Sequence, residues 1–201
     1  MNARSFLLGL FLASGACAKA ASDTTTAAKP PPSYPLESVP PELTAPVQRA
    51  NAAMQALMQK LVSQLLEELG RGGPQAAVKV CRDVAQPLTA QVAAEQKLEV
   101  GRTSHRLRNP KNAPRAWARP FVEAAAGKKA SEVDAVAVDL GDRVGVLRPI
   151  PVGAVCTQCH GNPAGFSPAL SGLLREAYPQ DEAVGFSEGD LRGFFWAEIR
   201  K

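Results

Sequence analysis

Residues 131–147 read SEVDAVAVDLGDRVGVL, and the side chains of 133–139 alternate between the two sides of an extended chain. Gly141 and Asp142 supply a turn, and residues 144–147 form a return strand, so a β-hairpin is predicted. A last apolar run, GFFWAEI at residues 193–199, predicts a terminal strand that completes a small sheet.

Two helices are predicted ahead of this sheet. Between residues 43 and 69 the apolar side chains recur at spacings of three and four, as on one face of an amphipathic helix. Gly70, Gly72 and Gly73 end this helix, and Pro74 suits the first turn of the next. The second helix runs to about Lys97, with a bend allowed at Pro87. Helices first and antiparallel strands later predict an α+β domain.

Composition narrows the classes of function. The chain has 201 residues, 45% of them hydrophobic and 21% charged, which suits one ordinary core. The formal net charge of +4 is scattered, and no Lys/Arg run with interleaved aromatic residues suggests a nucleic-acid partner. No internal stretch has the ~18 consecutive apolar residues of a membrane span, so a polytopic membrane protein is excluded.

The N-terminus resembles a secretory signal. Residues 1–18 combine Arg4, an apolar run at 6–13 and small residues before Cys17. Cleavage at Ala16-Cys17-Ala18 would release a soluble protein, whereas a lipobox at 14–17 would make Cys17 a lipidated N-terminus. Both remain open, so we expect a periplasmic or extracytoplasmic protein, either soluble or lipid-anchored. Residues 19–46, rich in Pro, Ala and Thr, are predicted to be a flexible tether, and residues 47–201 the folded domain.

One motif is chemically specific. Cys156-Thr157-Gln158-Cys159-His160 is C-x-x-C-H, typical of covalent c-type haem attachment. The thiols can add to the haem vinyl groups, and the adjacent His is then held under the iron. A zinc site would need further ligands, which only the distant Cys81 and His105 could supply. A redox C-x-x-C would need a thioredoxin-like βαβ unit, and a structural disulfide would leave His160 unexplained.

The second axial ligand of such a haem has several candidates: His105, Met54, Met58 and Cys81. Methionines on an apolar helix face are usually core residues. His105 lies in a polar, basic loop, where a solvated side chain is expected. Cys81 lies on the apolar face of the second helix and is either a buried structural thiol or a ligand. An unpaired thiol in an oxidising compartment is at risk unless something occupies it, and iron would do so.

Several motifs in order resemble one family from about Val47 to the C-terminus. These are AAVKVCRDVA at 76–85, Arg102-Thr103-Ser104, RNPKN at 108–112 with Trp117, Arg148-Pro149-Ile150 just ahead of CTQCHG, and AYPQDEAVGFSEGDLRG at 177–193. The resemblance is to the Tll-type haem domain family. It implies a PAS-like α+β fold, one haem c attached through Cys156 and Cys159, and axial ligation by His160 and Cys81.

Three arginines are candidate partners of the haem propionates. Arg102, Arg108 and Arg148 can each pair a carboxylate with forked hydrogen bonds, or can instead stabilise loops. Trp117 is expected in the core.

The ligand set that the resemblance implies favours a redox role. Two strong axial ligands leave no open iron position, so we expect no enzyme activity. A thiolate ligand favours ferric iron, so the expected function is low-potential one-electron transfer or redox response with an unidentified partner protein. The alternatives are a redox or gas sensor that signals to a separate partner, and a structural lipoprotein. The oligomeric state stays open.

Overall fold

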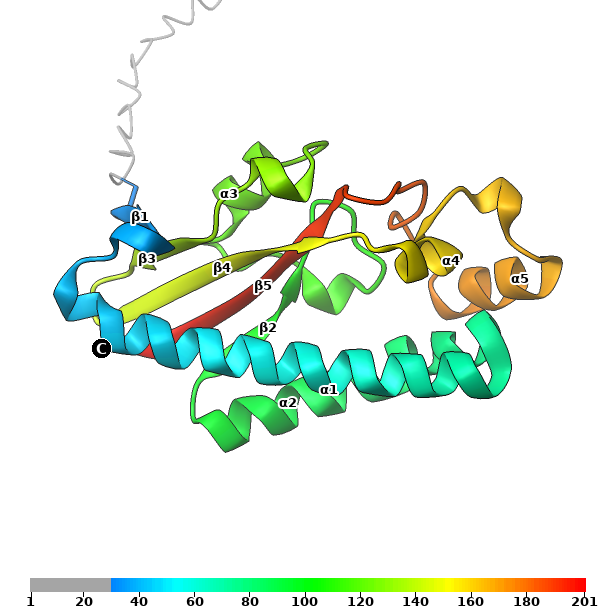
Figure 1. Cartoon of the computed structure of the whole chain (residues 1–201), viewed down its shortest axis with the longest axis horizontal. Helices are drawn as coiled ribbons and strands as arrows, with labels where there is room; N and C mark the ends of the chain where they lie inside the picture. Colours follow the sequence, from blue (N-terminus) through cyan, green and yellow to red (C-terminus); the bar gives the residue numbers. More distant parts are fainter. Residues whose placement is uncertain (1–29) are drawn as a thin grey trace, which may run out of the picture. The chain divides into compact units, whose positions relative to one another are not determined.

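The computed structural model describes residues 30–201; the predicted signal, Cys17 and the first part of the predicted tether lie outside them. Figure 1 shows helices on both sides of one antiparallel sheet. The strands are β1 (Ser33–Pro35), β2 (Glu99–Thr103), β3 (Val136–Asp139), β4 (Arg143–Pro151) and β5 (Leu191–Arg200). The helices are α1 (Pro41–Lys79), α2 (Ala85–Gln96), α3 (Arg119–Ala124), α4 (Thr157–His160) and α5 (Pro168–Ala177). The short turns are η1 (Leu36–Ser38), η2 (Val80–Val84), η3 (Pro110–Asn112), η4 (Ala130–Glu132), η5 (Ala154–Cys156) and η6 (Pro163–Gly165).

The sheet has the strand order β1-β3-β4-β5-β2, and every neighbouring pair is antiparallel. The predicted hairpin is β3 and β4, with Val136 opposite Leu147 and Asp139 opposite Val144. The predicted terminal strand is β5, which lies between β4 and β2. The α+β prediction, with long N-terminal helices and a small antiparallel sheet, is therefore confirmed.

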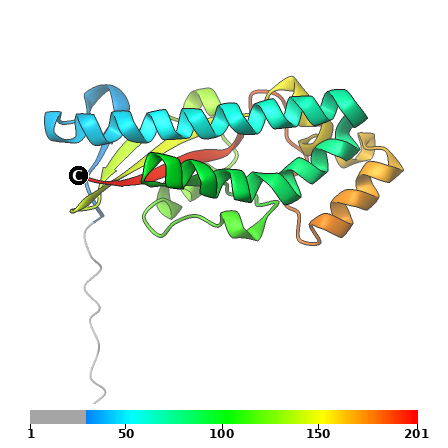
Figure 2. The ribbon, with the colours of Figure 1, turned by 90° about the horizontal axis from the view of Figure 1, so that it is seen from below.

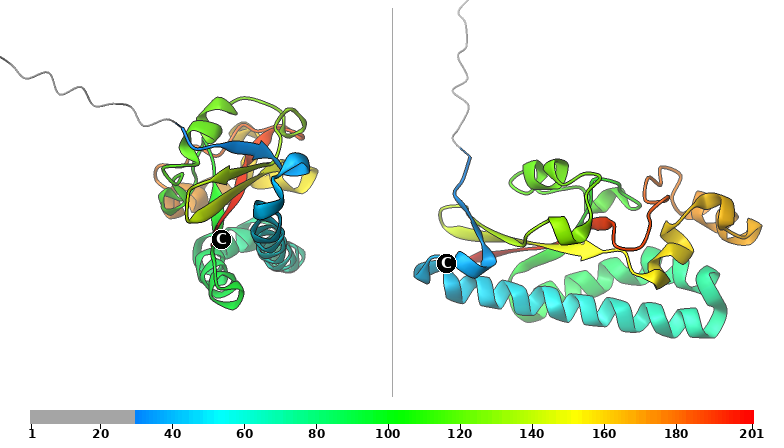
Figure 3. Two further views of the ribbon diagram at one scale, coloured as in Figure 1. Left: turned by 90° about the vertical axis from the view of Figure 1, so that its left-hand side faces the viewer. Right: turned by 45° about the horizontal axis from the view of Figure 1, so that its top comes forward.

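The largest core lies between the helices and one face of the sheet. Figures 2 and 3 show α1 and α2 side by side beneath the strands, with α3 on the opposite face. Leu43, Met54 and Leu57 of α1 pack with Val146 and Phe195 of the sheet. On the other face, Val122 of α3 packs with Leu147 and Phe194, and Trp117 and Phe121 adjoin them, as expected for Trp117. Within residues 30–201, no helix has the length and apolar character that a bilayer crossing requires.

The helical layer contains two breaks. Gly72 and Gly73 leave the helical conformation inside α1, close to the predicted end of the first helix. The second break is the π-helical turn η2, where the Ala85 N–H donates to the Val80 carbonyl. Pro87 lies one turn later, and its ring would collide with the carbonyl of residue 83 in a regular α-helix. The expected bend is therefore a π-turn that precedes Pro87 and contains Cys81.

The predicted tether extends too far, and the folded domain begins earlier than residue 47. Residues 33–35 form the edge strand β1 against β3, and α1 begins at Pro41. Proline is compatible with both positions, because an edge strand and a first helical turn leave N–H groups unbonded. Tyr34 and Leu36 pack against the core, and Leu43 is 1% exposed. The Pro-rich composition of this segment gave no sign that these apolar side chains pack in the core.

Two further boundaries differ from the sequence prediction. The first hairpin strand begins only at Val136, because residues 130–132 form the short turn η4. Strand β2 was not predicted, since its five residues, EVGRT, contain few apolar side chains. Gly101 in this strand lets the Trp196 ring lie close to the backbone, where a Cβ atom would be 2.7 Å from the ring.

A substitution at Gly145 tests how closely the sheet packs against Trp117. A Cβ atom at this position would lie 2.9 Å from the Trp117 ring, whereas at Gly172 in α5 it would meet nothing within 4 Å. We expect Gly145→Ala to lower the free energy of unfolding by about 1–3 kcal/mol through overpacking. Gly172→Ala should raise it by about 0.5–1 kcal/mol through helix propensity. Urea unfolding of both variants measures the difference, and equal effects would contradict the packing.

Candidate functional site

The C-x-x-C-H motif forms a tight turn at the end of the sheet where β4 finishes. Cys156 ends η5, and Thr157–His160 make the single helical turn α4. The Thr157 hydroxyl donates to the Ala154 carbonyl at 2.7 Å, and the Gly161 N–H donates to the Thr157 carbonyl at 2.9 Å. A Cβ atom on residue 161 would lie 2.5 Å from that carbonyl, so the turn requires the glycine that follows His160.

His160 is held in one orientation. Its Nδ1 lies 2.6 Å from the Ala183 carbonyl oxygen, which can only accept, so Nδ1 carries the proton and donates. The main-chain carbonyl of His160 accepts from the Phe186 N–H at 2.9 Å. Burial, followed by the charges of Arg192 and Arg108, holds the pKa of His160 well below its usual value. The imidazole is therefore neutral, with the Nε2 lone pair available to a metal ion.

A buried ion pair supports this orientation. Arg108 is 7% exposed and lies 2.9 Å from the Asp181 carboxylate. Its guanidinium also donates to the carbonyls of Cys159, at 2.6 Å, and Ala183, at 3.2 Å. The Asp181 carboxylate accepts from the Ala183 N–H at 2.8 Å. Of the two roles considered for Arg108, the structure therefore shows the loop-stabilising one.

Cys81 lies near the C-x-x-C-H turn. Val78, one helical turn before Cys81, packs in a cluster with Tyr178, and Cys159 adjoins that cluster. Burial raises the pKa of the Cys159 thiol. The charge of Arg108 lowers this pKa, and the neighbouring Cys81 and Cys156 raise it further. Burial, followed by the charge of Cys81, also raises the pKa of Tyr178 to about 12. The three predicted sulfur residues thus gather in one region, where each is a free thiol with partly exposed surface.

The other two predicted arginines lie in one row across the sheet. Arg102 of β2 is opposite Phe195 of β5, which is opposite Arg148 of β4. Residues directly opposite each other share a face, and Phe195 packs towards α1 and α2. Arg148 is exposed and donates to the Asn51 side chain at 3.3 and 3.4 Å. Within residues 30–201, the Arg102 side chain has no hydrogen-bond or ion-pair partner, and burial lowers its pKa.

His105 differs from the sequence prediction. It was expected to be solvated, but it is partly buried, with its ring centroid 6.1 Å from that of Phe186. Its Nδ1 is buried without a hydrogen-bond partner in the described part of the chain. Burial, followed by Arg106 and Arg192, lowers its pKa. The basic composition of the loop gave no sign that His105 packs beside Phe186.

Sequence reasoning assigned no site role to Asp181, Ala183 and Arg192. The Ala183 contribution is a main-chain carbonyl, which no side-chain pattern signals. Asp181 lies within the motif AYPQDEAVGF, and that position is the one signal that the sequence offers. Arg192 is one of the arginines whose charge acts on His160. Burial is the main cause that lowers the pKa of Arg192 to about 10.

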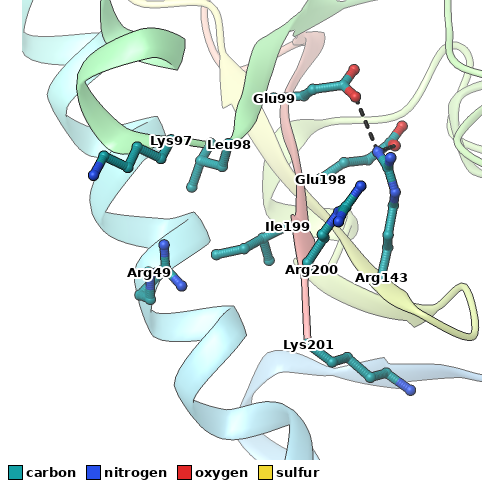
Figure 4. A pocket seen from close by; sticks show the side chains of 9 residues that line it. All are labelled: Arg49, Lys97, Leu98, Glu99, Arg143, Glu198, Ile199, Arg200 and Lys201. Carbon is teal, nitrogen blue, oxygen red and sulfur yellow. Dashed lines mark hydrogen bonds and ion pairs between the residues drawn. The ribbon is translucent and has the colours of Figure 1, made fainter.

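A separate pocket of about 410 Å³ contains none of the predicted site residues. Figure 4 shows side chains of α1, the start of β2, the start of β4 and the end of β5 around it, with Glu99 accepting from Arg143 at 3.1 Å. The C-x-x-C-H turn instead follows the end of β4. The two regions therefore lie at opposite ends of the sheet.

Fold and site together define a class: an α+β domain in which a C-x-x-C-H turn lies near a cysteine in a π-helical turn. The chain belongs to the Tll0287-like family, whose sequence profile, described as Tll0287, matches residues 37–199. It is also similar to a solved structure described as the cyanobacterial heme-protein Tll0287. The TM-score is 0.57 at 26% sequence identity, covering 81% of this chain and 98% of that chain. No curated protein matches the sequence.

The ion pair beneath His160 gives a stability prediction. Asp181→Asn leaves the buried Arg108 without a counter-charge, so we expect a loss of about 3–5 kcal/mol in the free energy of unfolding. The matched control is Glu67→Gln, which removes an exposed partner of Arg71 and should cost about 1 kcal/mol or less. Chemical unfolding of both variants measures the losses, and comparable values would rule out a structural role for the Asp181 carboxylate.

Proposed function

We propose that this protein is an exported c-type haem protein that acts in one-electron transfer or redox response. Haem c is attached through Cys156 and Cys159, and His160 and Cys81 are the axial ligands. Each thiol adds its S–H across a haem vinyl group, so a sulfur–carbon bond forms, the proton goes to the vinyl carbon, and nothing leaves. The bound haem supplies a reversible Fe(III)/Fe(II) couple.

The observation that carries the proposal is the orientation of His160. A metal-ligating histidine normally donates its other ring N–H to a carbonyl or carboxylate, and the Nδ1 contact with Ala183 provides this. The main chain therefore fixes the ring orientation that a metal-ligating histidine requires. The related Tll0287 structure, described as a heme-protein, supports the same cofactor.

The surrounding residues fit a haem in three respects. The thiols of the C-x-x-C-H turn are free and partly exposed, as thioether formation requires. Cys81 lies near Cys159 on a different element, so its sulfur and the His160 imidazole would both be available to hold one haem iron. Within residues 30–201, the partly buried Arg102 side chain has no ion-pair partner, and an acidic cofactor edge would supply one.

The cellular role follows from the export signal and the ligand set. Covalent haem attachment outside the bacterial cytoplasm agrees with secretion, so we propose a periplasmic or extracytoplasmic location, soluble or anchored through Cys17. Six-coordinate iron gives no substrate position, so the proposal includes no enzyme activity. The partner is a separate redox protein, and neither nucleic acid nor a bilayer interior is involved.

The ligand assignment is tested with protein expressed alongside haem-maturation machinery. Intact mass should show one covalent haem in the wild type, and Cys156→Ala should reduce its attachment. Cys81→Ser should keep the haem mass and change the ferric absorption spectrum, because the sulfur ligand is lost. His105→Gln is the matched control and should leave the spectrum unchanged. A wild-type mass without haem would falsify the proposal. A spectral change in His105→Gln but not in Cys81→Ser would identify His105, and not Cys81, as the second axial ligand.

A haem-based sensor is the second candidate, and the π-turn around Cys81 favours it. Single π-turns inside helices often mark functional sites, and relaxation to α-helix would turn Cys81 relative to the iron. Release of the thiolate on reduction, or on binding of a gas, would then change the end of α1 and the start of α2. The signal would pass to a separate partner protein.

Carbon monoxide distinguishes the two candidates. A permanently six-coordinate carrier should show the same ferrous spectrum with and without CO, since no iron position opens. A sensor should show a CO-bound spectrum in the wild type. Cys81→Ser serves as a positive control with a weakened ligand, and it should bind CO in both cases.

A further inference from the structure

Arg192 occupies an irregular position in β5. Gly193 is opposite Ile150 of β4, but Leu191 is opposite Pro151, so Arg192 is an extra residue in a β-bulge. Gly193 permits the bulge, because its φ of +150° and its close approach to the Thr103 carbonyl exclude a side chain. Bulges commonly redirect a side chain next to a functional site.

The bulge changes the face on which Arg192 lies. Leu191 and Phe194 pack in the same cluster beneath α3, although three positions apart in an unbulged strand they would lie on opposite faces. Arg192 instead donates to the Ser104 hydroxyl at 3.0 Å and to the Arg106 carbonyl at 3.1 Å. Arg102 is opposite Phe195 and therefore lies on the face that packs against α1 and α2, the helices on either side of Cys81.

The arginines on this face carry more positive charge than the protein balances. Arg108 is neutralised by Asp181, which is its ion-pair partner. Within residues 30–201, the Arg192 guanidinium donates hydrogen bonds only to a hydroxyl and a carbonyl, and the Arg102 side chain has no hydrogen-bond partner. The Arg192 guanidinium lies 5.4 Å from the centroid of the Phe186 ring, and the centroid of that ring is 6.5 Å from the centroid of the His160 ring. Partly buried cations without counter-charges are costly, so a negatively charged ligand is expected here.

We propose that Arg102 and Arg192 together form the propionate-binding site of the haem. This inference rests on the proposed function and assigns the site to an arginine pair from β2 and the β5 bulge. The pair replaces the earlier grouping of Arg102 with Arg108 and Arg148, whose side chains bond to Asp181 and to Asn51 respectively. Planar guanidinium groups suit this role because each can pair a carboxylate through forked hydrogen bonds.

The test uses matured holoprotein and the resonance Raman bending modes of the haem propionates. We expect Arg102→Gln and Arg192→Gln to keep the covalent haem mass, shift the propionate modes and lower the reduction potential, because a nearby positive charge favours Fe(II). Arg200→Gln is the control: it is exposed, lies at the far end of β5 and should behave as wild type. Arg192→Lys keeps the charge and should shift the modes with little change in potential.

The outcomes separate this inference from the function it rests on. A wild type without haem overturns the function and the inference with it. Haem-loaded variants whose propionate modes match the wild type overturn the inference alone. Unchanged propionate modes with an altered iron–sulfur stretch also overturn it, since the arginines would then act on the Cys81 thiolate. Shifted modes in both glutamine variants, absent in Arg200→Gln, support it.

Discussion

The interaction on which the site depends is the buried contact of Arg108 with Asp181. This pair joins three segments that are distant in the sequence: the loop after β2, the C-x-x-C-H turn and residues 181–183. Because Arg108 binds the Ala183 carbonyl that also accepts from His160, the ion pair and the imidazole share one acceptor. The orientation of the proposed iron ligand is therefore set by the packing of the loops.

The helical layer supplies the opposite side of the proposed haem site. A turn at Gly72 and Gly73 and a π-turn before Pro87 bring Cys81 close to the C-x-x-C-H turn, where an unbroken helix would carry it away. The sheet contributes charge through β2 and through the β5 bulge. Helices, sheet and loops each provide one component, which explains why the motif residues are spread over more than a hundred positions.

Much of this fold could be predicted from periodicity, because α1, the β3–β4 hairpin and β5 bury regular apolar faces. Strand β2 and edge strand β1 could not, since Gly101 and Pro35 stand where apolar alternation would be expected. For the proposed site, C-x-x-C-H is a direct chemical signal, and the family resemblance and the hazard of a free thiol point to Cys81. Arg192 was missed because a bulge reverses the face that alternation predicts.

The central claim is that one iron is bound by His160 and by the Cys81 thiolate. X-ray absorption at the iron edge of the ferric, matured protein tests it most directly, because sulfur and nitrogen scatter differently in the first coordination shell. The account predicts a single sulfur ligand among nitrogens in the wild type and its loss in Cys81→Ser. A wild-type shell made up only of nitrogen or oxygen would contradict the account, whatever the spectrum of the variant.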